Sequence, residues 1–216
     1  MSLAPKTDES AADPVPDRGQ QIIEAAYDLL DEAGLDGLTI RAVLTRTGLS
    51  RRAFYERFAG KDDLVLAVFE QTIRRAADHY SEEVKALGDP IERLKLIVTC
   101  IVLGKGTLEN EGEEHSSRRA AALSREHLRL AESRPDDLQA ALRPLIGLIA
   151  RQLSDGMARG SVRDYAPQRL AALIYNLVST TVHTELLAEE AAGADRGRRT
   201  ELATDIWEFC RRAIAR

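Results

Sequence analysis

A glycine break between two short amphipathic helices constrains this chain more than any other feature. Residues 39–61 read TIRAVLTRTGLSRRAFYERFAGK. Thr39 can cap a helix whose apolar residues recur at helical spacing, and Ser50 can cap a second helix. Gly48 lies between them and can take the positive φ that a tight inter-helix turn needs. The pattern predicts a helix-turn-helix, whose second helix can lie in a DNA major groove.

The same segment is basic, although the chain as a whole is acidic. It contains six Lys or Arg side chains and one Glu, a net charge of +5, whereas the whole chain carries −5. A local basic patch on an acidic protein is the expected footprint of a phosphate-binding surface. Arg51 and Arg52 follow the Ser50 cap directly, in the turn that reaches base edges in this geometry. We predict that both arginines read bases, because a guanidinium can pair with guanine through two hydrogen bonds.

The order of motifs from about Gln20 to Phe69 resembles the DNA-binding domain of the TetR family of bacterial transcriptional regulators. An amphipathic helix ends in Ala-Gly, and Gly-Leu-Thr-Ile, Gly-Leu-Ser, Phe-Tyr-x-x-Phe and Lys-Asp-Asp-Leu follow in that order. The resemblance implies a ligand-responsive repressor that binds a palindromic operator as a homodimer. It also implies that Tyr55 and Lys61 contact phosphate. Thr39 and Ser50 are further candidates for phosphate contact, beside their alternative role as plain helix caps.

The rest of the chain predicts an all-α protein of about nine helices, because it shows no strand signal and no repeat. We expect a disordered tail over residues 1–17, a three-helix helix-turn-helix DNA-binding domain over 18–63, and a larger helical domain for ligand binding and dimerisation over 64–216. The tail has one lysine against four acidic residues. That balance favours solvated disorder over an arm that reaches into the minor groove.

Glycine and proline positions predict where the helices begin and end. Pro144 lies inside an otherwise helical pattern and is expected to kink or split it. The expected helices cover residues 18–33, 61–87, 91–108, 116–133, 135–160, 167–192 and 200–216, in addition to the two short ones.

The helix over 167–192 carries two apolar rows and therefore needs two packing partners. The second row would face water in a monomer, so we predict that this helix and the last one form a four-helix interface between two subunits. The alternative is that both helices only close the monomer's own core. The resemblance implies the same dimer. The predicted interface residues are Leu170, Leu173, Leu177, Thr181, Thr184, Ile206 and Phe209.

The resemblance also implies a small-molecule pocket in the helical body, with an effector that releases DNA. Polar residues that interrupt the apolar helices are candidates to line it, but each has the alternative of bonding a backbone carbonyl or lying in an interface. Few charges fall in the apolar rows, which favours a mainly apolar ligand. The candidates are Thr99, Cys100, Tyr175, Asn176, Ser179, Thr180 and His183.

Two other classes of protein are alternatives to a regulator. An enzyme is disfavoured, because the acidic run with a histidine at 111–115 lacks paired ligand spacing, and no phosphate loop or nucleophile elbow occurs. We predict no catalytic residue, no metal site and no cofactor. A DNA-binding adaptor whose body binds a protein partner stays open.

Two further features of the sequence predict the cellular compartment of the protein. No apolar run approaches the roughly 18–20 residues that span a bilayer. The two cysteines, Cys100 and Cys210, lack a spacing motif and fit a reduced, cytoplasmic protein without a membrane partner.

Overall fold

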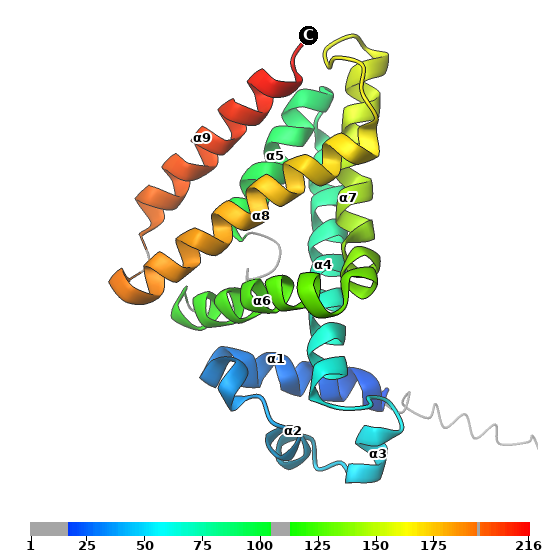
Figure 1. Ribbon diagram of the computed structural model, residues 1–216, viewed down its shortest axis with the longest axis vertical. Helices are drawn as coiled ribbons and strands as arrows, with labels where there is room; N and C mark the ends of the chain where they lie inside the picture. Colours follow the sequence, from blue (N-terminus) through cyan, green and yellow to red (C-terminus); the bar gives the residue numbers. More distant parts are fainter. Residues whose placement is uncertain (1–16, 105–112, 194) are drawn as a thin grey trace, which may run out of the picture.

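The computed structural model describes residues 17–104, 113–193 and 195–216. Nearly all of the predicted tail and most of the Gly/Asn loop before the sixth helix lie outside these ranges. Within these ranges the protein is all-α with nine helices, as predicted. The helices are α1 (Arg18–Gly37), α2 (Ile40–Thr47), α3 (Arg51–Tyr55), α4 (Lys61–Glu83, extended by a 3₁₀ turn, Val84–Ala86), α5 (Pro90–Leu103), α6 (Glu113–Ser133), α7 (Pro135–Ala158), α8 (Pro167–Ala192) and α9 (Arg196–Ile214). Helices α1 to α3 form a small lower layer, and the other helices form a larger body above it (Figure 1).

The helix-turn-helix has the caps and the turn that the sequence predicts. The Thr39 hydroxyl accepts a hydrogen bond from the Ala42 N–H at 3.0 Å, and the Ser50 hydroxyl accepts one from Ala53 at 3.2 Å. Gly48 ends α2 in the left-handed region, with φ 67° and ψ 8°. Local chemistry therefore determines both short helices and the angle at which the chain leaves the first for the second.

Several helix boundaries differ from the predicted ones for local reasons. The fifth helix ends at Leu103 and not near residue 108, because Gly104 adopts φ 69° and ψ 17° and caps it. The ninth begins at Arg196, where the Asp195 carboxylate accepts from the Arg198 N–H at 3.1 Å. Pro144 was expected to kink or split its helix, and the split is wrong, since α7 continues through it. Pro144 lies on the exposed side of α7, where water can bond the carbonyl that the missing N–H leaves free.

Helix α4 belongs to both layers of the molecule. Its first turns bury Leu64 and Val68 in one continuous core with Ile22 and Leu30 of α1. Its later turns rise into the body, where α4 packs along α7 (Figure 1). The body is completed by α5 against α7 and α9, and by α8 across α7 and α6. A single stiff helix therefore connects the lower layer to the body.

Helix α6 crosses directly over α1 and makes the second connection between the layers (Figure 1). The Arg119 guanidinium of α6 lies 2.8 Å from the Asp31 carboxylate of α1, with only 5% and 11% of their side chains exposed. The same guanidinium lies over the Tyr27 ring, 5.3 Å from its centroid, and Arg75 lies 5.2 Å from it. At the other end of α6 and beyond it, Arg129 and Arg134 pair with acidic residues of the first turn of α4.

Replacing Asp31 by Ala is expected to destabilise the protein by about 3–5 kcal/mol, because it leaves the buried Arg119 charge without its carboxylate. The double variant Asp31→Leu/Arg119→Met removes both charges and should recover most of that loss. Urea denaturation at one fixed protomer concentration measures both. A loss below about 1 kcal/mol in Asp31→Ala would contradict the importance of this ion pair.

Candidate nucleic-acid interface and interior pocket

The recognition helix α3 turns its charged side outward. Arg51, Arg52 and Tyr55 are exposed, while Ala53 and Phe54 on the other side are buried. The Arg52 side chain is 90% exposed, and its one ion pair within the described residues is with Glu56, one turn later, at 3.0 Å. The Tyr55 ring packs edge-on against Phe54, with centroids 5.4 Å apart, so its hydroxyl is held at the surface. The helix therefore presents two guanidinium groups and a phenol on one accessible side.

Part of the predicted positive charge is neutralised within the domain. Arg46 makes a two-pronged ion pair with Glu32 of α1, at 2.8 and 2.6 Å, and Arg57 lies 3.6 Å from Asp17. Arg41 and Arg51 have no ion pair within the part of the chain that the structure describes. The free positive charge of the domain thus concentrates on the exposed side of α2 and the start of α3.

The remaining predicted DNA contacts lie at helix starts around this surface. Thr39 and Ser50 are exposed and act as caps. The Lys61 ammonium donates to the Leu35 carbonyl at 2.7 Å, which holds the start of α4 against the α1–α2 connection. It retains two further N–H donors, so this bond and a phosphate contact are compatible.

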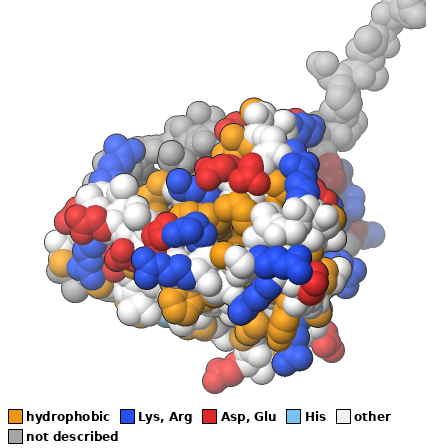
Figure 2. All heavy atoms as spheres, turned by 90° about the horizontal axis from the view of Figure 1, so that it is seen from above, with side chains coloured by type: hydrophobic (Ala, Val, Ile, Leu, Met, Phe, Trp, Pro, Cys, Tyr) orange, Lys and Arg blue, Asp and Glu red, His pale blue; other side chains and the backbone are white. Residues whose placement is uncertain are grey.

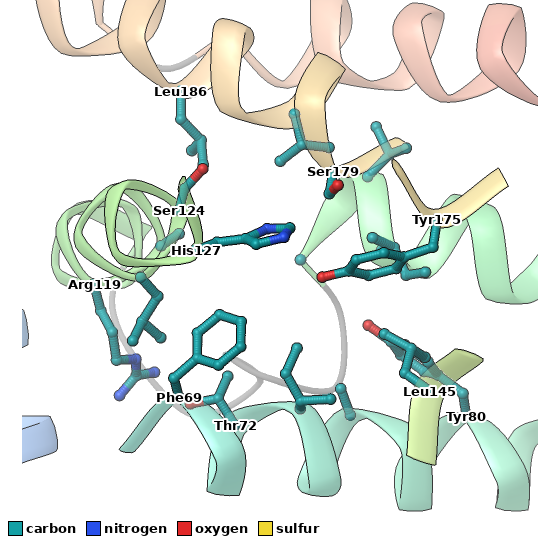
Figure 3. A pocket seen from close by; sticks show the side chains of 18 of the residues that line it. Phe69, Thr72, Tyr80, Arg119, Ser124, His127, Leu145, Tyr175, Ser179 and Leu186 are labelled. Carbon is teal, nitrogen blue, oxygen red and sulfur yellow. The ribbon is translucent and has the colours of Figure 1, made fainter. Parts of the chain in front are cut away.

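A second candidate site lies inside the body, between α4, α5, α6, α7 and α8 (Figure 3). Its volume is about 160 Å³. Apolar side chains form most of the wall, and no Asp or Glu is among the lining residues that the structure describes. The residues that line the pocket are Phe69, Thr72, Ile73, Ala76, Tyr80, Ile101, Val102, Gly104, Arg119, Ala120, Leu123, Ser124, His127, Leu145, Tyr175, Ser179, Val182, Leu186 and Arg199.

Most polar groups of the pocket wall are engaged by the protein itself. Ser124 and His183 share a hydrogen bond of 2.8 Å, and Ser179 donates to the Asn176 carbonyl at 3.3 Å. Thr72 donates to the Val68 carbonyl at 2.8 Å and also bonds the Tyr27 hydroxyl. Two lining residues, Thr72 and Arg119, therefore contact Tyr27 of α1, so the pocket wall directly adjoins the DNA-binding layer.

His127 and Tyr175 are the exceptions, since neither has a hydrogen bond within the described residues. Both side chains project into the pocket from opposite walls (Figure 3). Burial lowers the pKa of His127, and the nearby His183 lowers it further. Burial raises the pKa of the Tyr175 hydroxyl far above its ordinary value. The pocket therefore holds a neutral imidazole and a neutral phenol that are free to bond a guest.

The seven polar residues predicted for the ligand site are divided by the structure. Tyr175 and Ser179 line the pocket, and His183 bonds a lining residue. Asn176 and Thr180 lie on the exposed side of α8. Thr99 and Cys100 lie on α5 and are absent from the wall. The sequence reasoning missed His127, although Leu123, His127 and Leu130 recur at helical spacing on one side of α6.

The residues predicted for the dimer surface fall into three groups by their exposure. Leu173 and Phe209 are 54% and 64% exposed, and Thr184 is exposed as well. Leu177 and Thr181 are half-buried, whereas Leu170 and Ile206 are buried within the monomer. The exposed side of α8 forms one continuous row at helical spacing, comprising Leu173, Asn176, Thr180, Thr184 and Leu187.

The end of the body remote from the helix-turn-helix differs from the α2–α3 surface in its charge. Figure 2 shows acidic and basic side chains intermingled there, with apolar side chains between them. Across the described residues, no three His, Cys, Asp or Glu side chains gather as a metal site. No helix in the described ranges is both long and apolar enough to cross a membrane.

A helix-turn-helix with an exposed basic recognition helix, joined to a helical body with an interior pocket, defines the class of DNA-binding transcriptional regulators. Residues 22–68 match the family model described as bacterial regulatory proteins, tetR family. The chain is thus a TetR-like transcriptional regulator, and the family resemblance of the sequence is confirmed.

Known proteins resemble the chain along most of its length. The fatty acid metabolism regulator protein of Bacillus subtilis is 21% identical over 174 residues, which cover 79% of this chain and 84% of that protein. A TetR-family regulator from Pectobacterium atrosepticum has the same fold, with a TM-score of 0.69 and 20% identity over 91% of this chain and 93% of its own. The FadR regulator of B. subtilis, solved in complex with stearoyl-CoA, has a TM-score of 0.67 and 17% identity, over 88% of this chain and 96% of its own.

Stability should fall on acidification partly because of His127. Its pKa is depressed in the folded state, so the unfolded chain binds more protons between the folded pKa and about 6.5. The stabilisation that depends on neutral His127 is therefore complete above pH 7 and is lost as the pH falls through that window. Between pH 7.5 and pH 5, the free energy of unfolding of His127→Gln should therefore decline less steeply than that of the wild type. Equal slopes in urea titrations at a series of pH values would refute this role.

Proposed function

We propose that the protein is a ligand-responsive repressor that binds a palindromic operator as a homodimer, with an effector held in the interior pocket. The observation that carries the proposal is the contact of the pocket wall with α1, through Arg119 to Asp31 and through Thr72 to Tyr27. It links a cavity fit for a small molecule to the domain that carries the recognition helix. The protein would act in the cytoplasm, where the operator is, and catalyse no reaction.

On DNA, Arg51 and Arg52 would read base edges from the first turn of α3. Their exposure and their position after the Ser50 cap support this role. Tyr55, Lys61, Thr39 and Ser50 would hold the backbone, because hydroxyl, ammonium and helix-start N–H groups all suit phosphate oxygens. The Arg52–Glu56 pair would have to open for base contact, at small cost, since a pair so exposed is weak.

The dimer would form through the outer side of α8 together with α9. Leu173 and Leu187 of this row and Phe209 of α9 are large apolar side chains that are 54%, 41% and 64% exposed, and exposed apolar side chains of this size favour an interaction surface. We extend the predicted interface to Asn176, Thr180 and Leu187, which share this row. Leu170 and Ile206 would support it from within the subunit, because both are buried there.

Effector binding would act on DNA through α6. One part of α6 pairs with α1 through Arg119, and Arg129 near its end pairs with Asp62 at 3.4 Å. Just past α6, Arg134 bonds Asp63 at 2.7 Å, and Asp63 accepts from the Ala59 N–H after the recognition helix. A guest that displaces α6 would therefore shift both supports of the helix-turn-helix and change the spacing of the two recognition helices.

Gel-shift titrations with the native operator test the base-reading role. Arg51→Ala and Arg52→Ala should each lose about 1–3 kcal/mol of preference for the operator over unrelated DNA. Lys61→Ala should weaken binding to both DNAs alike and reduce the salt slope by about one. The operator is located first by genome-wide binding. Unchanged preference in both arginine variants would overturn the assignment, and failure to bind any site would overturn the proposed function.

Sedimentation analysis tests the dimer surface. Leu173→Glu should shift the protein from dimer to monomer, because it places a charge in an apolar interface. Leu128→Glu is the matched control, since Leu128 of α6 is also exposed, at 44%, but lies outside the proposed surface. It should remain a dimer. If both variants behave alike, the outer side of α8 is not the interface.

A further inference from the structure

The volume of the pocket, which opens partly to the surface, indicates the size of guest that it can surround. At about 160 Å³ it is close to the roughly 150 Å³ cavity known to accommodate a benzene molecule, and below the roughly 300–1,000 Å³ of drug-sized sites. The wall around it is packed, with Leu145, Tyr80 and Tyr175 almost fully buried. A guest that fits without moving the helices has the size of one substituted ring.

The wall offers aromatic surface from three different helices. The rings of Phe69 (α4), His127 (α6) and Tyr175 (α8) follow one another, with centroids 5.9 and 5.8 Å apart and planes tilted by 43° and 38°. Figure 3 shows all three around the same space, with the Tyr80 ring on its lower side. Tilted rings at these distances also favour an aromatic guest, which can meet them edge to face.

Charge complementarity argues against an ionised guest. Within the described part of the wall, a cation finds no carboxylate. An anion finds two guanidinium groups, but Arg119 is paired with Asp31 across a buried contact and Arg199 with Glu189 across a partly buried one. An ion placed here would lose its hydration without gaining an unpaired partner, which is costly.

The free hydrogen-bonding groups define the one polar feature of the guest. The Tyr175 hydroxyl is a donor with no acceptor in the described residues, on a side chain only 4% exposed. The His127 imidazole, also without a hydrogen bond there, provides one donor and one acceptor. An oxygen atom between them would satisfy groups that otherwise stay unpaired, and such pairing discriminates strongly against guests that lack the oxygen.

We propose that the effector is a neutral, single-ring aromatic compound whose one hydrogen-bonding oxygen bonds the Tyr175 hydroxyl and the His127 imidazole. This inference rests on the pocket being the effector site of the proposed repressor. A phenol and an aryl carbonyl share this chemistry. Both accept from the Tyr175 hydroxyl, and a phenol also donates to the imidazole nitrogen that lacks a proton.

Titration calorimetry of the full-length protein at pH 7.5 with five ring compounds of similar size, and with the long-chain decanol, provides the test. 4-Methylphenol and 4-methylbenzaldehyde should bind, toluene should bind more weakly, and benzoate and benzylamine should not bind measurably. Tyr175→Phe should weaken the binding of 4-methylphenol about three- to tenfold and leave the affinity for toluene unchanged, because it removes one hydrogen bond and little volume. Tyr165→Phe, at an exposed tyrosine outside the pocket, should match the wild type for every compound.

Tighter binding of benzoate, benzylamine or the long-chain decanol than of 4-methylphenol would overturn the inference. So would an unchanged affinity for 4-methylphenol in Tyr175→Phe. The compound series on the wild type decides the question even if that variant does not fold. A protein that binds its operator but none of the oxygenated rings would refute the inference and leave the repressor function standing. A protein that binds the oxygenated rings but no operator would refute the repressor function and leave the ligand chemistry of the pocket standing.

Discussion

The ion pair between Asp31 and Arg119 is the contact on which the relation between the two layers depends. Both side chains are almost completely buried, so each charge has lost most of its hydration and depends on the other for compensation. Arg75 and Arg119 both lie over the Tyr27 ring, and the Tyr27 hydroxyl bonds Thr72 of α4. Because this cluster joins α1 to α4 and α6, the body determines where the recognition helix is held.

Helix α8 separates two surfaces with different proposed roles. Its inner side supplies Tyr175, Ser179, Val182 and Leu186 to the pocket, and its outer side carries the exposed row that begins at Leu173. The Glu189–Arg199 ion pair then ties its end to the start of α9. A guest that shifts α8 would therefore reach both the subunit contact and, through α6, the DNA-binding layer. This arrangement explains how a small pocket could influence the distance between two operator-binding domains.

The sequence predicted the parts of the structure that depend on neighbouring residues. The caps at Thr39 and Ser50, the glycine turn and the outward arginines all follow from local chemistry within 23 residues, 39–61. The pocket does not, because Phe69, His127 and Tyr175 come from three helices that only tertiary packing brings together. Polarity alone does not show which side of α8 a residue faces. Asn176 and Thr180 were therefore predicted as ligand residues together with Tyr175, although they lie on the exposed side of the helix. The continuity of α7 through Pro144 likewise depends on which side of the helix meets water.

The central claim is that α6 couples the pocket to the recognition helix. Hydrogen exchange tests this coupling without any knowledge of the effector. Binding operator DNA should change the exchange rates of backbone amides over residues 119–130 of α6, which lie outside the DNA surface, as well as those of α1 to α3. Changes confined to residues 17–61, with α6 unaffected at saturating operator, would contradict the account.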